Sequence, residues 1–221
     1  MTKAERALET RERILKAACE VIADIGFENV SMRKVAEHAG VSKALLHYHF
    51  DTREKLFAEA MTHSFAQTGT DLDGGDADVP AGVLLARIVR TMLPTDAELR
   101  QDWKLWQELW VRAQRDDAAR HLAVDLYDQL HAWVGGAVER GVASGEFAPC
   151  DVAAISTLIL ALCDGLGIRV MLADPHVDLP RPSRRSGRPS PRHWASLPPS
   201  LRPDSSAPWS GRGQPSTPVA V

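Results

Sequence analysis

The stretch from Ser31 to Phe50 constrains the fold most, because it has the pattern of two short helices joined by a tight turn. Gly40 stands where the first helix must end and reverse, a position that favours the left-handed conformation glycine adopts without steric penalty. Ser42 follows two residues later, where its hydroxyl can accept from the free N–H groups that open a helix. Together these positions predict a helix-turn-helix.

Apolar and polar residues of this stretch separate onto different helix faces. The apolar ones recur at helical spacing, and core packing is the better interpretation for Leu46 and Phe50. His47 and His49 do not suit a metal pair, because positions i and i+2 of a helix point to different faces. The polar residues on the outside are able to contact a nucleic-acid backbone or base edges: Ser42, Lys43, His47, Tyr48 and His49. The pattern therefore predicts DNA binding.

Charge supports this prediction only locally. Residues 1–60 carry ten basic and ten acidic side chains, so the region is not basic overall. Between residues 31 and 49, two lysines, three histidines and Arg33 stand against a single acid, Glu37. DNA binding must then rest on the placement of individual side chains rather than on bulk charge.

Helical periodicity continues along the chain to about residue 172. A first helix is expected from about residue 10, capped at or near Thr10, to residue 25, where Gly26 ends it. Capping-box patterns at Asp51 and Thr95 open two further helices, the first running to about Phe65 and the second including Trp103 to Trp110. The remaining helices are expected over about 80–93, 118–143 and 151–172. No window alternates as a strand does, so the predicted fold is all-α with eight or nine helices.

Composition divides the chain into three parts. Residues 1–60 form the predicted helix-turn-helix domain and residues 61–179 a second helical domain, with a flexible linker at the Gly-, Asp- and Thr-rich residues 66–79. Residues 180–221 hold ten Pro, nine Ser and seven Arg against one acid, which predicts a disordered tail. The abrupt loss of helical pattern after Leu179 suggests a frameshift or a divergent start of disorder, with non-specific contact of the basic tail with DNA as the alternative.

Other function classes find little support. Three widely spaced cysteines predict neither disulfides nor a zinc site, and Cys19 and Cys163 are expected to be buried. No signal stretch and no run of roughly 18 uninterrupted apolar residues is seen, so a cytoplasmic location without membrane contact is expected. No nucleophile elbow, metal-ligand set or dinucleotide fingerprint is found, so we expect no enzyme activity, cofactor or metal.

The chain resembles a known family of regulators. About residues 10–60 resemble the TetR family of bacterial transcriptional regulators, and residues 80–173 resemble more weakly the C-terminal domain of its BetI-like members. The first resemblance is carried by Ala17-Ala18, Gly26-Phe27, Ser31-Met-Arg-Lys-Val-Ala, Ala39-Gly-Val-Ser42, Tyr48-His-Phe50 and Lys55-Leu56. The second is carried by Trp103 to Trp110, Gly141 to Phe147 and Leu162-Cys-Asp-Gly-Leu166.

The resemblance implies a homodimeric repressor of a palindromic double-stranded DNA operator, with residues 42–48 in the major groove and dimer contacts from residues 118–143 and 151–172. It also implies that a small-molecule effector in residues 61–179 releases the DNA. By position, the resemblance implies that the residues facing bases or the groove are Ser42, Lys43, Ala44 and Leu45. Those contacting phosphates are Tyr48, His49 and Lys55. Arg33 contacts the backbone or a groove edge, and His47 is a further candidate for a DNA contact. The alternative is a helical partner-binding protein whose DNA-reading head is degenerate.

Three tryptophans indicate where an effector would bind. Trp103, Trp106 and Trp110 form one aromatic stripe on a helix, which is either core packing or the wall of a ligand pocket. The polar candidates for such a pocket are Glu108, Arg112, Tyr127, His131 and Asp164. An aromatic wall with a carboxylate suits a cationic or quaternary amine effector through cation–π attraction.

Overall fold

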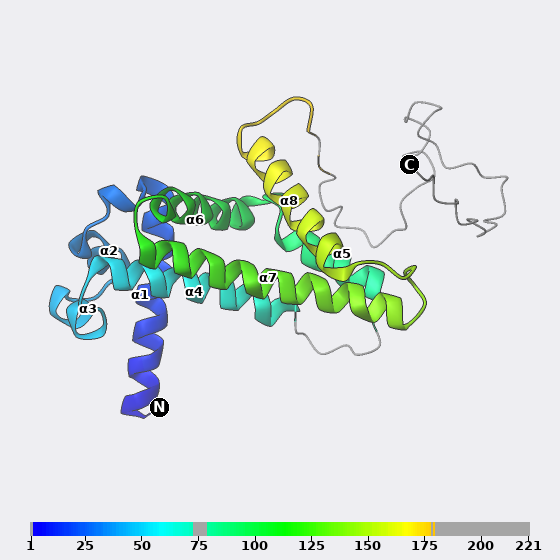
Figure 1. Ribbon diagram of the computed structural model, residues 1–221. Helices are drawn as coiled ribbons and strands as arrows, with labels where there is room; N and C mark the ends of the chain where they lie inside the picture. The colour runs from blue at the N-terminus through cyan, green and yellow to red at the C-terminus, as the bar shows by residue number, and fades with distance from the viewer. Residues whose placement is uncertain (1, 73–78, 178, 180–221) are drawn as a thin grey trace, which may run out of the picture. The chain divides into compact units, whose positions relative to one another are not determined.

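The computed structural model describes residues 2–72, 79–177 and 179, and within these ranges its regular structure is entirely helical (Figure 1). The elements are α1 (Lys3–Ile25), the short 3-10 helix η1 (Phe27–Asn29), α2 (Met32–Ala39), α3 (Lys43–His49), α4 (Arg53–Leu72), α5 (Ala81–Thr91), α6 (Ala97–Ala113), α7 (Asp117–Ala143) and α8 (Val152–Met171). The all-α prediction is confirmed. The predicted tail, residues 180–221, lies outside the described residues.

The helix-turn-helix forms at the predicted positions. Ser31 caps α2 by accepting from the Lys34 N–H at 3.2 Å, and Ser42 caps α3 by accepting from the Leu45 N–H at 3.1 Å. Gly40 ends α2 with φ 64°, in the left-handed region that its place in the turn requires. These local contacts explain why the sequence pattern alone located the motif.

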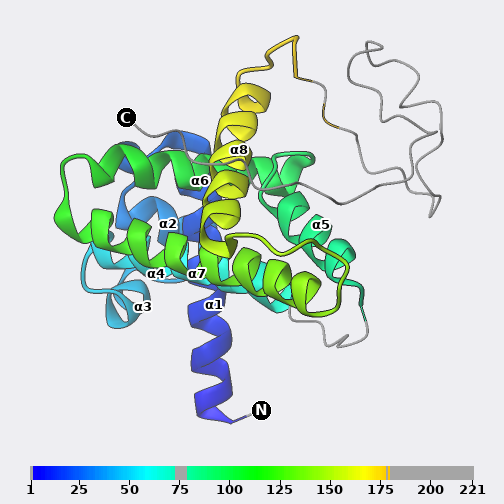
Figure 2. The ribbon, with the colours of Figure 1, turned by 45° about the vertical axis from the view of Figure 1, so that its right-hand side comes forward.

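Helix α1 begins earlier than predicted. Thr2, rather than Thr10, is its N-cap: the Thr2 hydroxyl accepts from the Glu5 N–H at 3.2 Å, and the Glu5 carboxylate accepts from the Thr2 N–H at 2.7 Å. Thr10 lies inside the helix and donates back to the Arg6 carbonyl at 2.8 Å. The first turns of α1 therefore extend beyond the neighbouring helices, and Leu8 is exposed there (Figures 1 and 2).

Helix α4 corrects two further predictions. Its cap is Thr52, which accepts from the Lys55 N–H at 3.1 Å, and not Asp51. The helix continues to Leu72, so the first seven residues of the predicted linker are helical. Packing against α7 explains this. The Phe65 ring stacks on the Trp133 ring with centroids 4.8 Å apart, and a Cβ on Gly69 would lie 2.8 Å from an atom of the Trp133 ring.

Helices α5 to α8 complete the described part of the chain. Asp96, and not Thr95, caps α6 by accepting from the Leu99 N–H at 3.0 Å. An apolar cluster joins α5, α7 and α8 through Ile88, Val134, Ala137, Val138 and Leu160. Cys19 and Cys163 are buried, as predicted. The position of α6 matters most for function, because it packs on α1 as well as on α7.

Helix α8 crosses α7 and leaves much of its own surface uncovered (Figure 2). By length and composition it is apolar enough to cross a membrane, although Asp164 and Arg169 interrupt its apolar sequence. Its large exposed apolar residues are Leu158, Leu162 and Ile168, followed by Leu172 just beyond the helix end. An exposed apolar surface of this kind is typical of sites that contact another protein or a membrane.

Candidate functional site

The outer face of α3 carries most of the residues predicted to contact DNA. Leu46 and Phe50 are fully buried, so α3 is fixed to the core through one side only. Tyr48 is 81% exposed, which is unusual for a large aromatic side chain and typical of a contact residue. The predicted residues that are exposed around it are Ser42, Lys43, Ala44, Leu45 and His47, while His49 is half-buried. A short helix held in this way suits the major groove.

Two predicted contact residues lie on the elements either side of α3. Arg33 is exposed on α2 and lies 3.7 Å from the Glu37 carboxylate. Lys55 is exposed on the first turn of α4, where its ammonium group lies 3.2 Å from the Asp51 carboxylate. An exposed ion pair of this kind is weak, so a DNA phosphate can replace either acid.

A second candidate site is a pocket lined by residues of α4 to α8. Its volume is about 700 Å³, which includes its opening to solvent. Trp103, Trp106 and Trp110 all line it, joined by Phe65 and Tyr127. Their rings contact one another edge to face, with Trp103 and Trp110 centroids 5.6 Å apart and Trp106 and Tyr127 centroids 5.5 Å apart. The tryptophan stripe is thus a pocket wall, and Trp103 in addition packs deep in the protein.

Two carboxylates give the pocket its electrostatic character. Asp102 accepts a hydrogen bond from the Ser64 hydroxyl at 2.7 Å, and Asp164 accepts one from the Tyr127 hydroxyl at 2.8 Å. Burial raises the pKa of both carboxyl groups more than these hydrogen bonds lower it. None of the described residues that line the pocket is basic, so the negative charge has no counter-ion there. Such a site favours a cation.

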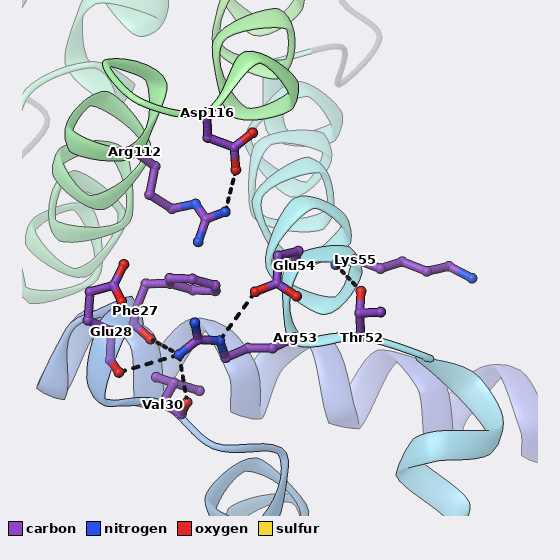
Figure 3. Close-up of polar contacts among 9 residues, drawn as sticks. All are labelled: Phe27, Glu28, Val30, Thr52, Arg53, Glu54, Lys55, Arg112 and Asp116. Carbon is purple, nitrogen blue, oxygen red and sulfur yellow. Dashed lines mark hydrogen bonds and ion pairs between the residues drawn. The ribbon is translucent and has the colours of Figure 1, made fainter.

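Three of the predicted pocket residues do not line this pocket. Glu108 and Arg112 lie on the opposite side of α6, where both contact Phe27. Figure 3 shows Arg112 beside the Phe27 ring. His131 is half-buried one turn after Tyr127, at a level where Leu130 faces the pocket instead. The correction for α6 follows from helix geometry, because residues two positions apart point to different sides.

Sequence reasoning also missed Asp102 and Ser64. Asp102 precedes Trp106 by four residues and Trp110 by eight, so the helical spacing that identified the tryptophan stripe would also have found this carboxylate. Ser64 had no comparable signal, because its place depends on how α4 packs against α6.

Comparisons with known proteins agree with this geometry. Residues 14–60 match the model of the tetR family of bacterial regulatory proteins, and residues 83–183 match the C-terminal domain of the BetI-type transcriptional repressor. HTH-type transcriptional regulators BetI from Agrobacterium fabrum and Brucella anthropi are 30% and 29% identical, each covering 72% of this chain and 75% and 80% of their own lengths.

Solved structures give the same assignment. A putative transcriptional regulator from Saccharomonospora viridis, in complex with choline, superposes with a TM-score of 0.69 at 30% identity, covering 76% of this chain and 88% of that one. A putative TetR-family regulator from Rhodococcus sp. superposes with a TM-score of 0.67 at 27% identity, covering 75% and 89%. This chain belongs to the TetR family of transcriptional regulators and has a BetI-like C-terminal domain.

Proposed function

We propose that this protein is a cytoplasmic, homodimeric repressor that binds a palindromic operator and releases it when a small organic cation occupies the pocket. The observation that carries the proposal is the pocket itself, which is lined by four indole or phenol rings and two carboxyl groups and by no basic residue among those described. Choline in the structurally similar regulator from Saccharomonospora viridis supports a ligand with a quaternary ammonium group.

The exposed face of α3 supports the DNA-binding part of the proposal. Lys43 is able to donate to guanine O6 or N7, and the Ala44 methyl group is able to contact the thymine methyl. Tyr48 offers a rigid hydroxyl donor to a phosphate, and Lys55 offers a charge at a helix N-terminus that already attracts anions. A degenerate reading head would not be expected to keep these side chains exposed together.

The exposed apolar face of α8 supports the homodimer. Leu158 and Leu162 are each 55% exposed and stand one turn apart on the same side of the helix. A second copy of the chain, related by a two-fold axis, can cover this face with the same residues. A palindromic operator follows from that symmetry, because two identical reading heads recognise two identical half-sites.

The pocket supports a monovalent cation with methyl substituents. Each aromatic ring around a desolvated cation contributes on the order of 0.5–2 kcal/mol, so three tryptophans and a tyrosine give useful affinity without a direct salt bridge. The two carboxylates add attraction at longer range, since the half-buried site screens charge less than water does.

Isothermal titration tests this function directly. Choline is titrated into the full-length protein beside the neutral alcohol in which a tert-butyl group replaces trimethylammonium, and the same ligands are added to the complex with DNA selected from a random pool. We expect choline to bind at least about tenfold more tightly and to release the DNA. The effector assignment would be refuted if the two compounds bound equally well, or if choline, polyamines and cationic dyes all failed to bind. Dimeric reading would be refuted if the selected DNA contained no palindrome.

A further inference from the structure

Helix α6 presents different sides to the pocket and to the helix-turn-helix. Asp102, Trp106 and Trp110 follow one another at four-residue intervals and line the pocket. Glu108 and Arg112 point the other way, to the turn that joins α1 to α2. Because backbone hydrogen bonds hold a helix together along its length, a ligand that displaces α6 through the tryptophans also displaces this second pair.

Phe27 is the residue that receives both contacts. Its backbone N–H donates to the Glu108 carboxylate at 2.9 Å, and the Arg112 guanidinium lies 3.8 Å from the centre of its ring. The Arg53 guanidinium lies 4.2 Å from the same ring. Figure 3 shows the phenyl ring between the two guanidinium groups, with Asp116 holding Arg112 at 2.6 Å. Phe27 is therefore fixed from α6 on one side and from α4 on the other.

Arg53 carries the contact onward to the elements that flank α3. Its Nη1 donates to the carbonyls of Phe27, Glu28 and Val30, each at 3.3 Å (Figure 3). Val30 directly precedes the Ser31 cap of α2, and Arg53 itself opens α4. The same small group of side chains thus fixes the start of the helix-turn-helix and the helix that follows it.

The contacts around Phe27 leave a buried nitrogen of Arg112 without a hydrogen-bond partner. In the described residues, the two buried side-chain polar atoms without a hydrogen-bond partner are Thr95 Oγ1, just before α6, and Arg112 Nε, in its last turn. A buried donor without a partner is unfavourable, so this arrangement of α6 is less strongly favoured than a fully paired one would be. A ligand switches an element most easily where the competing arrangements differ little in free energy.

We propose that Phe27, Glu108, Arg112 and Arg53 form a clamp, here called the Phe27 clamp, that couples occupancy of the pocket to the orientation of α3. These are positioning residues, because the clamp acts through α2 and α4 and needs no contact of its own with DNA or ligand. The choline-dependent part of the inference rests on the proposed function; the coupling between the two sides of α6 does not.

Two variants of the full-length protein break the contact between the Arg112 guanidinium and the Phe27 ring with little change of volume, and both leave the backbone hydrogen bond from Phe27 to Glu108 in place. Arg112→Met keeps the apolar stem but loses the guanidinium, and Phe27→Leu keeps an apolar side chain but loses the aromatic face. Arg120→Ala is the matched control, because Arg120 pairs with Asp117 on an exposed surface at 2.8 Å. Arg112→Lys tests rescue, since it restores the charge without the planar fork.

The first measurement is the ratio of operator affinities without and with saturating choline. In the wild type and in Arg120→Ala we expect choline to weaken operator binding by about 5- to 150-fold, the usual range of allosteric coupling. In Arg112→Met and Phe27→Leu we expect a change below about twofold, with partial recovery in Arg112→Lys, while choline affinity stays within about threefold. A purely structural role would lower all affinities together and leave the ratio unchanged.

The second measurement needs no effector. Operator binding should alter hydrogen exchange of residues 102–110 in the wild type and in Arg120→Ala, and not in the clamp variants, because coupling between two sites is reciprocal. If choline has no effect on the wild type but operator binding still alters hydrogen exchange of residues 102–110, the effector assignment is refuted and the clamp is supported. No change in the wild type, or the same change in clamp variants, refutes the clamp. If Arg112→Met does not fold, the result for Phe27→Leu decides.

Discussion

Gly167 on α8 lies directly against the ring of Trp103, and its replacement by alanine tests how closely the pocket wall is packed. A Cβ at this position would lie 1.9 Å from Cζ2 and 2.1 Å from Cη2 of the indole. The ring would have to move by roughly 1.5 Å to reach an ordinary carbon–carbon separation. Trp103 has little room to do so, because it is 5% exposed and its Nε1–H donates to the Met92 carbonyl at 2.9 Å.

The expected loss of stability follows from three contributions. Overpacking of this kind costs about 1–3 kcal/mol, and loss of the indole hydrogen bond costs a further 0.5–1.5 kcal/mol or so. Alanine in place of glycine inside a helix returns about 1 kcal/mol. Gly167→Ala should therefore destabilise the protein by about 2 kcal/mol, which lowers the midpoint of thermal unfolding by roughly 4–8 °C.

Thermal unfolding followed by circular dichroism, at one protein concentration, measures this effect. Gly136→Ala is the control, because Gly136 also lies inside a long helix but a Cβ there meets nothing within 4 Å, so the midpoint should stay the same or rise. The reasoning is refuted if Gly167→Ala melts at or above the wild-type temperature, or if both variants lose the same stability.

Three shorter predictions concern charge, assembly and DNA. Burial raises the pKa of the Asp164 carboxyl, so protons compete with a bound cation, and choline affinity should rise with pH above the ordinary aspartate range. In titration calorimetry, Asp164→Asn should flatten this pH dependence. The same variant should stabilise the unliganded protein at neutral pH, because burial makes the charged form of Asp164 unfavourable in the folded state. Leu162→Glu should give a monomer in sedimentation equilibrium, whereas Val111→Glu, which is 61% exposed on α6, should not. Lys55→Ala should reduce the slope of log operator affinity against log salt by about 1.8 for the dimer, about 0.9 for each of its two Lys55 side chains, measured beside Arg120→Ala as a control with the wild-type slope.

Features that depend on neighbouring residues could be predicted from the sequence. Ser31, Gly40 and Ser42 act on backbone groups a few residues away, so their residue types alone locate the caps and the turn. The end of α4 depends instead on Phe65 and Gly69 packing on Trp133, which is distant in sequence. A Gly- and Thr-rich composition favours a loop, and the packing free energy outweighs that preference.

The candidate pocket shows the same division at the level of one helix. Spacing on α6 identified the tryptophan side, because a stripe needs only helical geometry. The same spacing places Asp102 on that side and Glu108 and Arg112 away from it, but it does not show that Glu108 and Arg112 meet Phe27. A polar side chain on a helix acquires its role from the element packed opposite, and that element is known only once the chain is folded.

Burial raises the pKa of the Asp102 and Asp164 carboxyl groups on the pocket side of α6, and the unpaired Nε of Arg112 lies on the other side of the helix. Buried carboxyl groups without a basic neighbour and a buried donor without a partner both lower stability, and such features are expected where function rather than stability determines the residue. In the proposed switch, a cation beside the two carboxyl groups offsets their negative charge on the pocket side of α6, and the resulting shift of the helix changes the contact of Arg112 with Phe27 on the other side. The ligand needs to favour the shifted helix by only a few kcal/mol to reverse the preference of the reading head.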